Sequence, residues 1–369
     1  MEKINKVRFR DLSISDPILK KELLQAVDRV LTHGQLLMGE EVELFERKIA
    51  DYCGTKYCVG VSSGTDAIYL ALRTLDLNPT DEVITTPLSW IATLNAIHLA
   101  GAKSVFVDIT EDLNINAELI ESAITPNTKA ILPVHFTGRL CNMERIRQIA
   151  KKYNLAVVED AAQAFGAMSS GNYAGSFGNL AAFSMNPMKV FPGYGEAGVV
   201  LTNDKSSYEK LLALRYLGTV NKEICYYPSL NAKIDTIQAA MMLVSFKNLE
   251  HNINRRIEIA NYYTSELFNI VKCPKNDFPP NSRCVFFDYT IMADSRDELK
   301  EYLDSKGIET KIKHPILMSN QPAYKFLHNQ SFPIAEKAVK NILCLPIHEK
   351  LTLVETKYVC DHIKKFYQK

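Results

Sequence analysis

The 369-residue sequence lacks an excess of charge of either sign, and it lacks long apolar runs. Its 43 lysines and arginines are balanced by 42 aspartates and glutamates, which leaves a formal net charge of +1. Binding to nucleic acid or to an anionic membrane normally requires a broad positive field, so neither partner is expected. No stretch of about 20 apolar residues could span a bilayer, and the polar start MEKINKVRFRDLSISDP has no signal-peptide core. We therefore expect a cytoplasmic protein.

The sequence also lacks the cysteine patterns of metal sites and disulfide frameworks. Its eight cysteines are scattered, with no C-x-x-C pair and no cysteine–histidine cluster of zinc-site spacing. We expect reduced thiols and no metal. With 47% apolar and 23% charged residues, the chain is typical of an ordinary globular protein, and its length exceeds what one core usually supports. A larger and a smaller domain are predicted.

Apolar runs alternate with helical segments through the first half of the chain. Two amphipathic segments, at about 18–32 and 40–53, precede short apolar runs such as YCVGV, EVITT and LAVVEDA, which are separated by segments of helical period. This rhythm is typical of β-α-β crossovers on a mainly parallel sheet. The helical stretch at 234–268 is too long for another crossover and is predicted to link the domains. We expect a large domain at 1–250 and a small α+β domain at 251–369.

Three segments at the ends of predicted strands carry candidate chemistry, because ligands of open α/β sheets bind beyond the carboxyl ends of the strands. In the first, SSGTDA (62–67), a strand passes into a helix. Gly64, Thr65 and Asp66 should therefore present free backbone amides to a phosphate group. A helix cap without a ligand is the alternative.

The second segment, VVEDAAQAFGA (157–167), ends an apolar strand in two acids. Asp160 and Gln163 are predicted to lie together at the rim of the sheet. A buried carboxylate there is costly unless it meets a cation, and a protonated pyridine nitrogen is such a cation. An aspartate that caps the following turn is the alternative.

The third segment, AAFSMNPMKVFPGYGEAGVV (181–200), places Ser184 and Lys189 in a loop rich in glycine and proline between two apolar strands. A desolvated lysine amine can attack an aldehyde or move protons, whereas a solvated surface lysine is the alternative. A phosphate cradle, an acid for a pyridinium and a free lysine are together the contacts that pyridoxal phosphate requires. Trp90, the only tryptophan, could cover the cofactor ring or lie in the core.

Long motifs in these and other segments give the chain a resemblance to the DegT/DnrJ/EryC1/StrS aminotransferases. The resemblance runs nearly end to end through SSGTDAIYLAL, SWIATLNAI, ILPVHFTG, VVEDAAQAFGA, FSMNPMKVFPGYGEAGVV, NAKIDTIQAA, SKGIETKIKHPI and LPIHEKLT. It implies an α/β architecture of fold type I, like that of aspartate aminotransferase. Such a fold has a large domain with a mainly parallel seven-stranded sheet flanked by helices, and a smaller C-terminal α+β domain.

The resemblance also implies an activity. These enzymes use pyridoxal 5'-phosphate, with pyridoxamine 5'-phosphate as the intermediate form, to move an amino group to a keto-sugar. Glutamate is the expected donor, the sugar is usually nucleotide-linked, and the setting is amino-sugar or surface-glycan biosynthesis. Sugar dehydratases of the same fold carry histidine at the Schiff-base position, so Lys189 favours amino transfer over dehydration. A non-catalytic regulator or scaffold is the remaining alternative.

Site residues follow from the matched motifs. Lys189 is implied to hold the cofactor as a Schiff base and to move protons, Asp160 to pair with the ring nitrogen, and Gln163 to lie near the ring hydroxyl. Thr65 and Asp66, with their backbone amides, and the Ser184 hydroxyl are implied to bind the phosphate.

Two further roles are implied by the same motifs. Trp90 is implied to stack on the ring. Asn231 is implied to reach the phosphate bound by a neighbouring subunit, which predicts a homodimer with shared sites.

Three departures from the family pattern bear on the substrate, and the last of them lies where this family meets its sugar. Lys233 stands at the position of a usual arginine, Glu196-Ala197-Gly198 replaces Asp-Gly-Gly, and HPILMSNQ replaces YPxPLHxQ. Lysine does not reproduce the bidentate geometry of arginine. A free keto-sugar acid or a cyclitol therefore stays open as the substrate, and Lys233, His314 and His135 are candidate substrate contacts. A core histidine is the alternative for His135.

Overall fold

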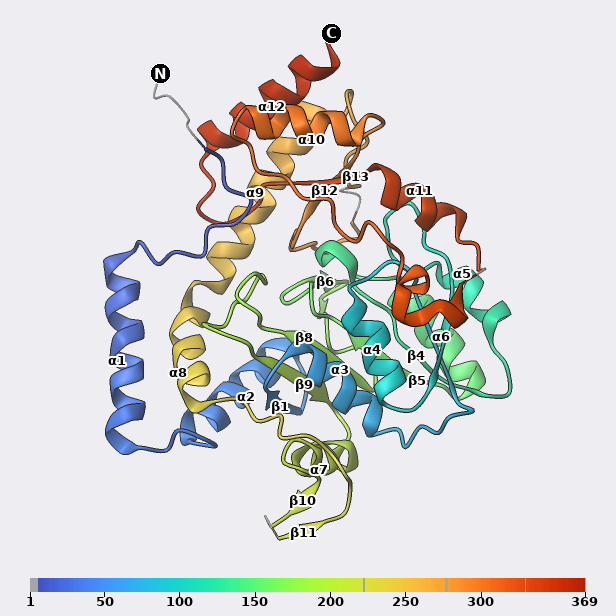
Figure 1. The fold of residues 1–369 in the computed structure, drawn as a ribbon. Helices are drawn as coiled ribbons and strands as arrows, with labels where there is room; N and C mark the ends of the chain where they lie inside the picture. The colour runs from blue at the N-terminus through green and yellow to red at the C-terminus, as the bar shows by residue number, and fades with distance from the viewer. Residues whose placement is uncertain (1–5, 222, 276–277, 329, 369) are drawn as a thin grey trace.

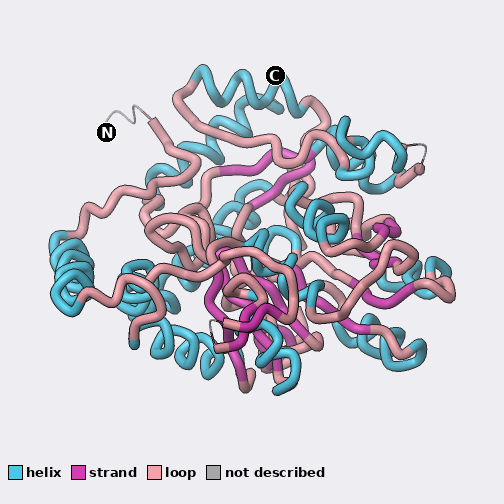
Figure 2. The backbone as a smooth tube through the Cα atoms, turned by 60° about the horizontal axis from the view of Figure 1, so that its bottom comes forward, coloured by secondary structure: helices cyan, strands magenta, loops and turns pink. Residues whose placement is uncertain are grey.

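A seven-stranded sheet lies at the centre of the larger part of the protein (Figures 1 and 2). The computed structural model describes residues 6–221, 223–275, 278–328 and 330–368. In spatial order the strands are β1 (Tyr57–Val61), β9 (Gly198–Thr202), β8 (Leu180–Ser184), β5 (Ala156–Asp160), β4 (Thr128–Ile131), β2 (Glu82–Thr85) and β3 (Lys103–Phe106). Only β9 runs antiparallel to its neighbours β1 and β8, while the β8-β5-β4-β2-β3 pairs are parallel. The predicted mainly parallel seven-stranded sheet is confirmed.

Helices cover both faces of this sheet, because alternate residues of each strand point to opposite sides. In β8, Ala181 and Phe183 pack into one apolar cluster and Leu180 and Ala182 into another. One face is covered by α3 (Gly64–Arg73), α4 (Ile91–Leu99) and α7 (Lys205–Leu214), and the other by α2 (Glu40–Cys53), α6 (Met143–Tyr153) and α8 (Thr236–Ser245). The inner strands β8 and β9 are buried at every residue, which is why both consist almost entirely of apolar residues and glycine.

The two helices predicted before the first strand are present as α1 (Pro17–His33) and α2. Asp16 caps α1 by accepting from Ile18 N at 2.8 Å, and Gly34 ends it with a φ of 75°. The first helix packs along α8 at the side of the molecule (Figure 1). Several of its outward side chains are apolar and exposed, namely Ile18, Leu24 and Leu31.

A smaller part follows the long helix α9 (Leu249–Leu267), which runs from the sheet to the top of Figure 1. There β12 (Tyr289–Met292) pairs antiparallel with β13 (Ile342–Leu345). Helices α10 (Arg296–Ser305) and α12 (Leu353–Tyr367) pack together over them.

The N-terminal segment returns to this smaller part, because Val7 bridges Ile308 and is buried in the same apolar cluster. The predicted boundary at residue 250 falls at the start of α9, and the division into domains stays a prediction.

Shorter elements complete the described chain. They are α5 (Ala117–Ile120), α11 (Pro333–Asn341), the 3-10 turns η1 (Glu121–Ala123), η2 (Phe136–Gly138), η3 (Phe246–Asn248), η4 (Met318–Asn320) and η5 (Pro322–Leu327), and the strand pairs β6 (Met168–Ser169) with β7 (Asn172–Tyr173) and β10 (Thr219–Val220) with β11 (Ile224–Cys225). The β10–β11 pair protrudes from the large part at the bottom of Figure 1. Within the described residues, no helix has both the length and the apolar character that crossing a membrane demands.

Candidate functional site

The first turn of α3 lies directly against the end of β8. A Cβ added to Gly64 would stand 2.4 Å from Cβ and 2.8 Å from Oγ of Ser184, so only glycine permits this approach. Ser63 caps the helix by accepting from Asp66 N at 3.1 Å. The amides of Gly64 and Thr65 belong to the turn in which a helix has no internal acceptors. The sheet thus brings the predicted cradle and the Ser184 hydroxyl together at one helix N-terminus, where an anion is stabilised.

The Asp66 side chain is already engaged within this cradle. Its Oδ2 accepts from the hydroxyls of Ser62 and Ser63 at 2.5 and 2.8 Å. Asp66 therefore holds the turn in shape, and phosphate binding by the backbone amides beside it stays a prediction.

Asp160 ends β5, the strand next to β8, and is buried. Burial raises the pKa of this carboxyl above its ordinary value, while donors to the carboxylate and the charge of Lys189 act against the rise. Thr93 Oγ1 donates to Oδ2 at 2.7 Å, and Ala162 N donates to Oδ1 at 3.2 Å. A carboxylate in such a place gains most from a further cation.

Sequence reasoning missed Thr93. Its hydroxyl also lies 2.9 Å from that of Ser89, so a buried chain of two hydroxyls leads to Asp160. The available signal was its place in the first turn of α4, a helix that begins after the carboxyl end of β2.

Lys189 lies in the loop that joins β8 to β9, and hydrogen bonds order this loop. Lys189 N donates to Asn186 O at 2.8 Å, and the Asn186 side-chain amide donates to Glu196 at 2.5 Å. The Lys189 side chain is partly buried, with its amine 4.7 Å from the centre of the Phe287 ring. Burial lowers the pKa of the amine to about 8, and the charge of Lys313 adds to this effect.

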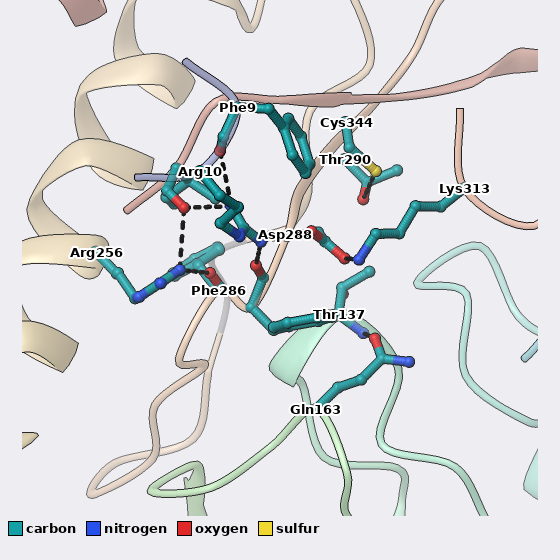
Figure 3. A network of polar contacts seen from close by, with 12 residues as sticks. Phe9, Arg10, Thr137, Gln163, Arg256, Phe286, Asp288, Thr290, Lys313 and Cys344 are labelled. Carbon is teal, nitrogen blue, oxygen red and sulfur yellow. Dashed lines mark hydrogen bonds and ion pairs between the residues drawn. The ribbon is translucent and has the colours of Figure 1, made fainter. Parts of the chain in front are cut away.

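Sequence reasoning missed a cluster of charged side chains beside the same ring, and Figure 3 shows its members Arg10, Asp288 and Lys313. The Lys313 ammonium stands 4.0 Å from the centre of Phe287 and pairs with Asp288, which Arg10 also contacts at 2.7 Å. Burial alone would raise the pKa of Asp288, but Lys313 and Arg10 hold it below its ordinary value. These residues come from segments nearly 300 positions apart, so no local pattern connects them.

Gln163 and Trp90 differ in their exposure to solvent. Gln163 is buried, and its Oε1 accepts from Thr137 N at 2.9 Å. Trp90 is 62% exposed at the start of α4. It is therefore not a core tryptophan, and its predicted stacking on a cofactor ring stays a prediction.

The two candidate histidines differ in their contacts. His135 is fully buried, with Nε2 2.9 Å from Glu159 and Nδ1 accepting from Cys141 N at 3.2 Å. Both ring nitrogens are used, so the structure favours the core-histidine alternative. His314 lies beside the Trp90 ring at 5.7 Å, and burial lowers its pKa to about 4, so its ring is uncharged at neutral pH.

Asn231 and Lys233 lie on a segment beside the strand that leads into the cradle. Ser62 N donates to Ala232 O at 2.9 Å, and Val61 bridges Lys233. Asn231 is exposed and contacts the Lys233 amine, which stands 3.7 Å over the Tyr216 ring. An exposed side chain can reach a second subunit, and this role of Asn231 stays a prediction.

A cavity of about 760 Å³ opens beside Lys189. It lies between the N-terminal segment 10–19, the loop 187–194, the start of α9 and residues 348–350. Its volume falls in the range of small-molecule sites.

The arrangement fits pyridoxal phosphate on features of this chain alone. A helix N-terminus with a glycine that a Cβ would block, a buried acid and an amine of lowered pKa all lie at the carboxyl ends of neighbouring strands. A phosphate, a pyridinium nitrogen and an aldehyde are the matching groups.

Known proteins are similar to this chain in sequence and in fold. Residues 17–364 match the DegT/DnrJ/EryC1/StrS aminotransferase family. The chain is 38% identical to the pleiotropic regulatory protein of Geobacillus stearothermophilus, over 98% of this chain and 99% of the other. It is 37% identical to dTDP-3-amino-3,6-dideoxy-alpha-D-galactopyranose transaminase of Aneurinibacillus thermoaerophilus, over 98% and 99%.

Two crystal structures superimpose closely. DesV of Streptomyces venezuelae, in complex with a ketimine intermediate, shares 36% identity with a TM-score of 0.95 over 99% of both chains. NtdA of Bacillus subtilis, with bound cofactor PMP, shares 31% identity with a TM-score of 0.93 over 99% of this chain and 86% of the other.

Proposed function

The chain belongs to the DegT/DnrJ/EryC1/StrS aminotransferase family, and from this we propose that it uses pyridoxal 5'-phosphate to aminate a nucleotide-linked keto-sugar. The observation that carries the proposal is the meeting of Lys189, Asp160 and the Gly64 turn at one edge of the sheet. The named transaminase among its relatives acts on a dTDP-linked sugar, which supports the nucleotide handle.

The residues at the sheet edge would hold the cofactor at three points. The amides of Gly64 and Thr65 and the Ser184 hydroxyl would bind its phosphate, and Asp160 would keep its ring nitrogen protonated. When bound, pyridoxal phosphate supplies the electron sink that makes the Cα proton of an amino acid acidic, and it carries the amino group as pyridoxamine phosphate. Gln163 and Trp90 would contact the ring from the positions described above.

Lys189 is the group that moves protons in the proposed reaction. Its amine would join the cofactor aldehyde at rest and, once displaced by the amino donor, would take the proton from the donor Cα and return one to the sugar carbon. An amine with a pKa of about 8 is close enough to neutral pH to do both. As a carboxylate, Asp160 would accept the hydrogen bond of the protonated ring nitrogen and so hold the proton there.

Glutamate is the proposed donor, and a homodimer is the proposed assembly, with Asn231 of each chain reaching the phosphate in the other. The exposed position of Asn231 next to the strand that leads into the cradle supports this arrangement. The cavity beside Lys189 is the proposed place of the sugar. A cytoplasmic location also belongs to the proposal.

Borohydride trapping tests the cofactor assignment. Purified protein is incubated with pyridoxal phosphate, reduced and digested, and the modified peptide is identified by mass spectrometry. We expect the adduct on Lys189, its loss in Lys189→Ala, and its retention in Lys205→Ala, which removes an exposed lysine of α7. A wild-type protein that takes up no cofactor contradicts the proposal.

An amination assay tests the substrate class. Glutamate-dependent amination is compared across dTDP- and UDP-linked keto-sugars, free keto-sugar acids and keto-cyclitols. Activity on the nucleotide-linked sugars alone is expected. Activity confined to the free acids or cyclitols contradicts the nucleotide handle and leaves the aminotransferase chemistry in place.

A further inference from the structure

Two lysine amines share one aromatic ring at the candidate site. The Nζ atoms of Lys189 and Lys313 lie 4.7 Å and 4.0 Å from the centre of the Phe287 ring. Lys189 comes from the loop after β8, whereas Lys313 comes from the segment between α10 and η4. Lys313 has no role in the proposed function, yet it is the cation that most lowers the pKa of Lys189.

Lys313 is held in place by a fully buried acid. The Asp288 side chain has no exposed area, and its two oxygens contact different cations, with Oδ2 on Lys313 and Oδ1 on Arg10 (Figure 3). Arg10 is itself fixed, because it donates to the backbone carbonyls of Phe287 and Ile347. The ammonium of Lys313 therefore cannot swing away from the ring as a surface lysine can.

Within this cluster, two cations share one acid next to Lys189. Asp288 is ionised, since its pKa lies below the ordinary value despite burial, and it serves two cations at once. One positive charge is left over beside the shared ring. A charged Lys189 would add a like charge at a partly buried place, which disfavours protonation of its amine.

Other charged groups also face Lys189. Asp160 from the end of β5, Asp288, and Glu196 from its own loop all favour the charged amine. His314 is uncharged at neutral pH because burial and Lys313 lower its pKa. Besides Lys189, the charged and titratable side chains around the adjoining cavity are Arg10, Asp11, Asp16, Tyr194, His251, Arg256, His348, Glu349 and Lys350. With three acids favouring its charged form, Lys189 depends on burial and Lys313 for its neutral fraction.

We infer that Lys313, fixed by Asp288 and Arg10, is a positioning residue that increases the uncharged fraction of the Lys189 amine at neutral pH. The uncharged amine is the form that attacks an aldehyde and accepts a proton. The chemical use of this effect rests on the proposed function, but the effect itself belongs to the protein without cofactor.

Competitive acylation of the cofactor-free protein measures the effect. The protein is treated with trace amine-reactive reagent across a range of pH, and the labelled fraction of the Lys189 peptide is read by mass spectrometry. In Lys313→Met the midpoint of Lys189 labelling should rise by about one pH unit. Its labelling rate at neutral pH should then fall by about tenfold.

Three variants separate charge from structure. Lys313→Arg keeps the cation and should keep the wild-type midpoint, whereas Lys313→Gln, whose amide can still donate to Asp288, should shift it as Lys313→Met does. Lys311→Met removes an exposed lysine two residues earlier that faces the Phe9 ring instead, at 5.1 Å, and should change nothing.

An unmoved midpoint in folded Lys313→Met or Lys313→Gln overturns the inference, as does an equal shift in Lys311→Met. If the midpoint shifts but the wild type never binds pyridoxal phosphate, the proposed function fails and the inference stands. If the wild type binds the cofactor and the midpoint does not move, the inference alone fails.

Discussion

The hydroxyl of Thr93 in α4 donates a 2.7 Å hydrogen bond to Oδ2 of Asp160 at the end of β5. Asp160 is buried, and burial raises its pKa. The Thr93 hydroxyl therefore helps to keep Asp160 ionised, and the proposed cofactor site depends on that charge.

Replacing Thr93 by valine should weaken cofactor binding. The methyl group keeps the shape but removes a hydrogen bond to a charged group, which is worth about 1.5–3 kcal/mol or roughly 10- to 100-fold in affinity. Titration of the cofactor-free protein with pyridoxal phosphate measures the change. Thr93→Ser restores the hydroxyl and should recover most of the affinity, and equal binding by the valine and wild-type proteins would contradict this role.

Gly64→Ala should damage the cradle by overlap, because its Cβ would stand 2.4 Å from Cβ of Ser184. Overpacking of this kind costs about 1–3 kcal/mol of stability. Removing the opposing side chain in Gly64→Ala/Ser184→Gly should recover part of the melting temperature but not the affinity for the cofactor, since the hydroxyl is gone. If Gly64→Ala alone keeps the wild-type stability and cofactor affinity, the close approach of Gly64 to Ser184 is not needed.

Asp288 should make the protein sensitive to acid. Its folded pKa is below the ordinary value of 3.8, so the unfolded chain binds more protons in this range. The stability that Asp288 contributes is then present above about pH 4 and lost as the pH falls through the folded pKa. Urea unfolding from pH 6 down to pH 3 should give a shallower loss of stability in Asp288→Asn than in the wild type. Parallel curves would argue against an ionised Asp288.

His135→Ala should affect stability rather than substrate affinity. The side chain is fully buried and contacts Glu159 and Cys141, so its removal leaves a buried acceptor with one partner fewer, at about 1–3 kcal/mol. Thermal unfolding should show the loss, while KM for the sugar stays unchanged. A raised KM without loss of stability would restore His135 as a substrate contact.

Mixed dimers test whether sites are shared. Lys189→Ala removes the reactive amine, and Asn231→Asp would place a negative charge at the phosphate of the site it serves. If Asn231 serves the partner's site, a hybrid of the two inactive variants contains one intact site and regains activity. If each site is built from one chain, both sites of the hybrid are damaged. Refolding or co-expression of differently tagged chains, followed by assay of the hybrid, distinguishes the two.

Local sequence patterns and motifs were enough to predict the sheet, its helical layers and the segments of the candidate site. The alternation of apolar runs and amphipathic helical segments predicted a mainly parallel sheet with helical layers, because the helical period of 3.6 residues follows from backbone geometry. The family resemblance implied that the sheet has seven strands. The segments around Gly64, Asp160 and Lys189 each end a strand, and parallel strands end at one edge, so their meeting was predictable. The long family motifs predicted the aminotransferase activity.

Contacts between residues far apart in the sequence could be found only in the tertiary structure. Arg10, Asp288 and Lys313 meet at Phe287 only because the N-terminal segment returns to the smaller part of the fold. Thr93 reaches Asp160 only because the fold brings the first turn of α4 to the end of β5. Burial lowers the pKa of Lys189, and contacts with Glu159 and Cys141 occupy both ring nitrogens of His135. Both effects are properties of the packed molecule. The sequence therefore predicts Lys189 as the reactive amine and Asp160 as the acid of the cofactor site. The protonation states of these two side chains depend on charges and hydrogen-bond donors that only folding brings within a few ångströms.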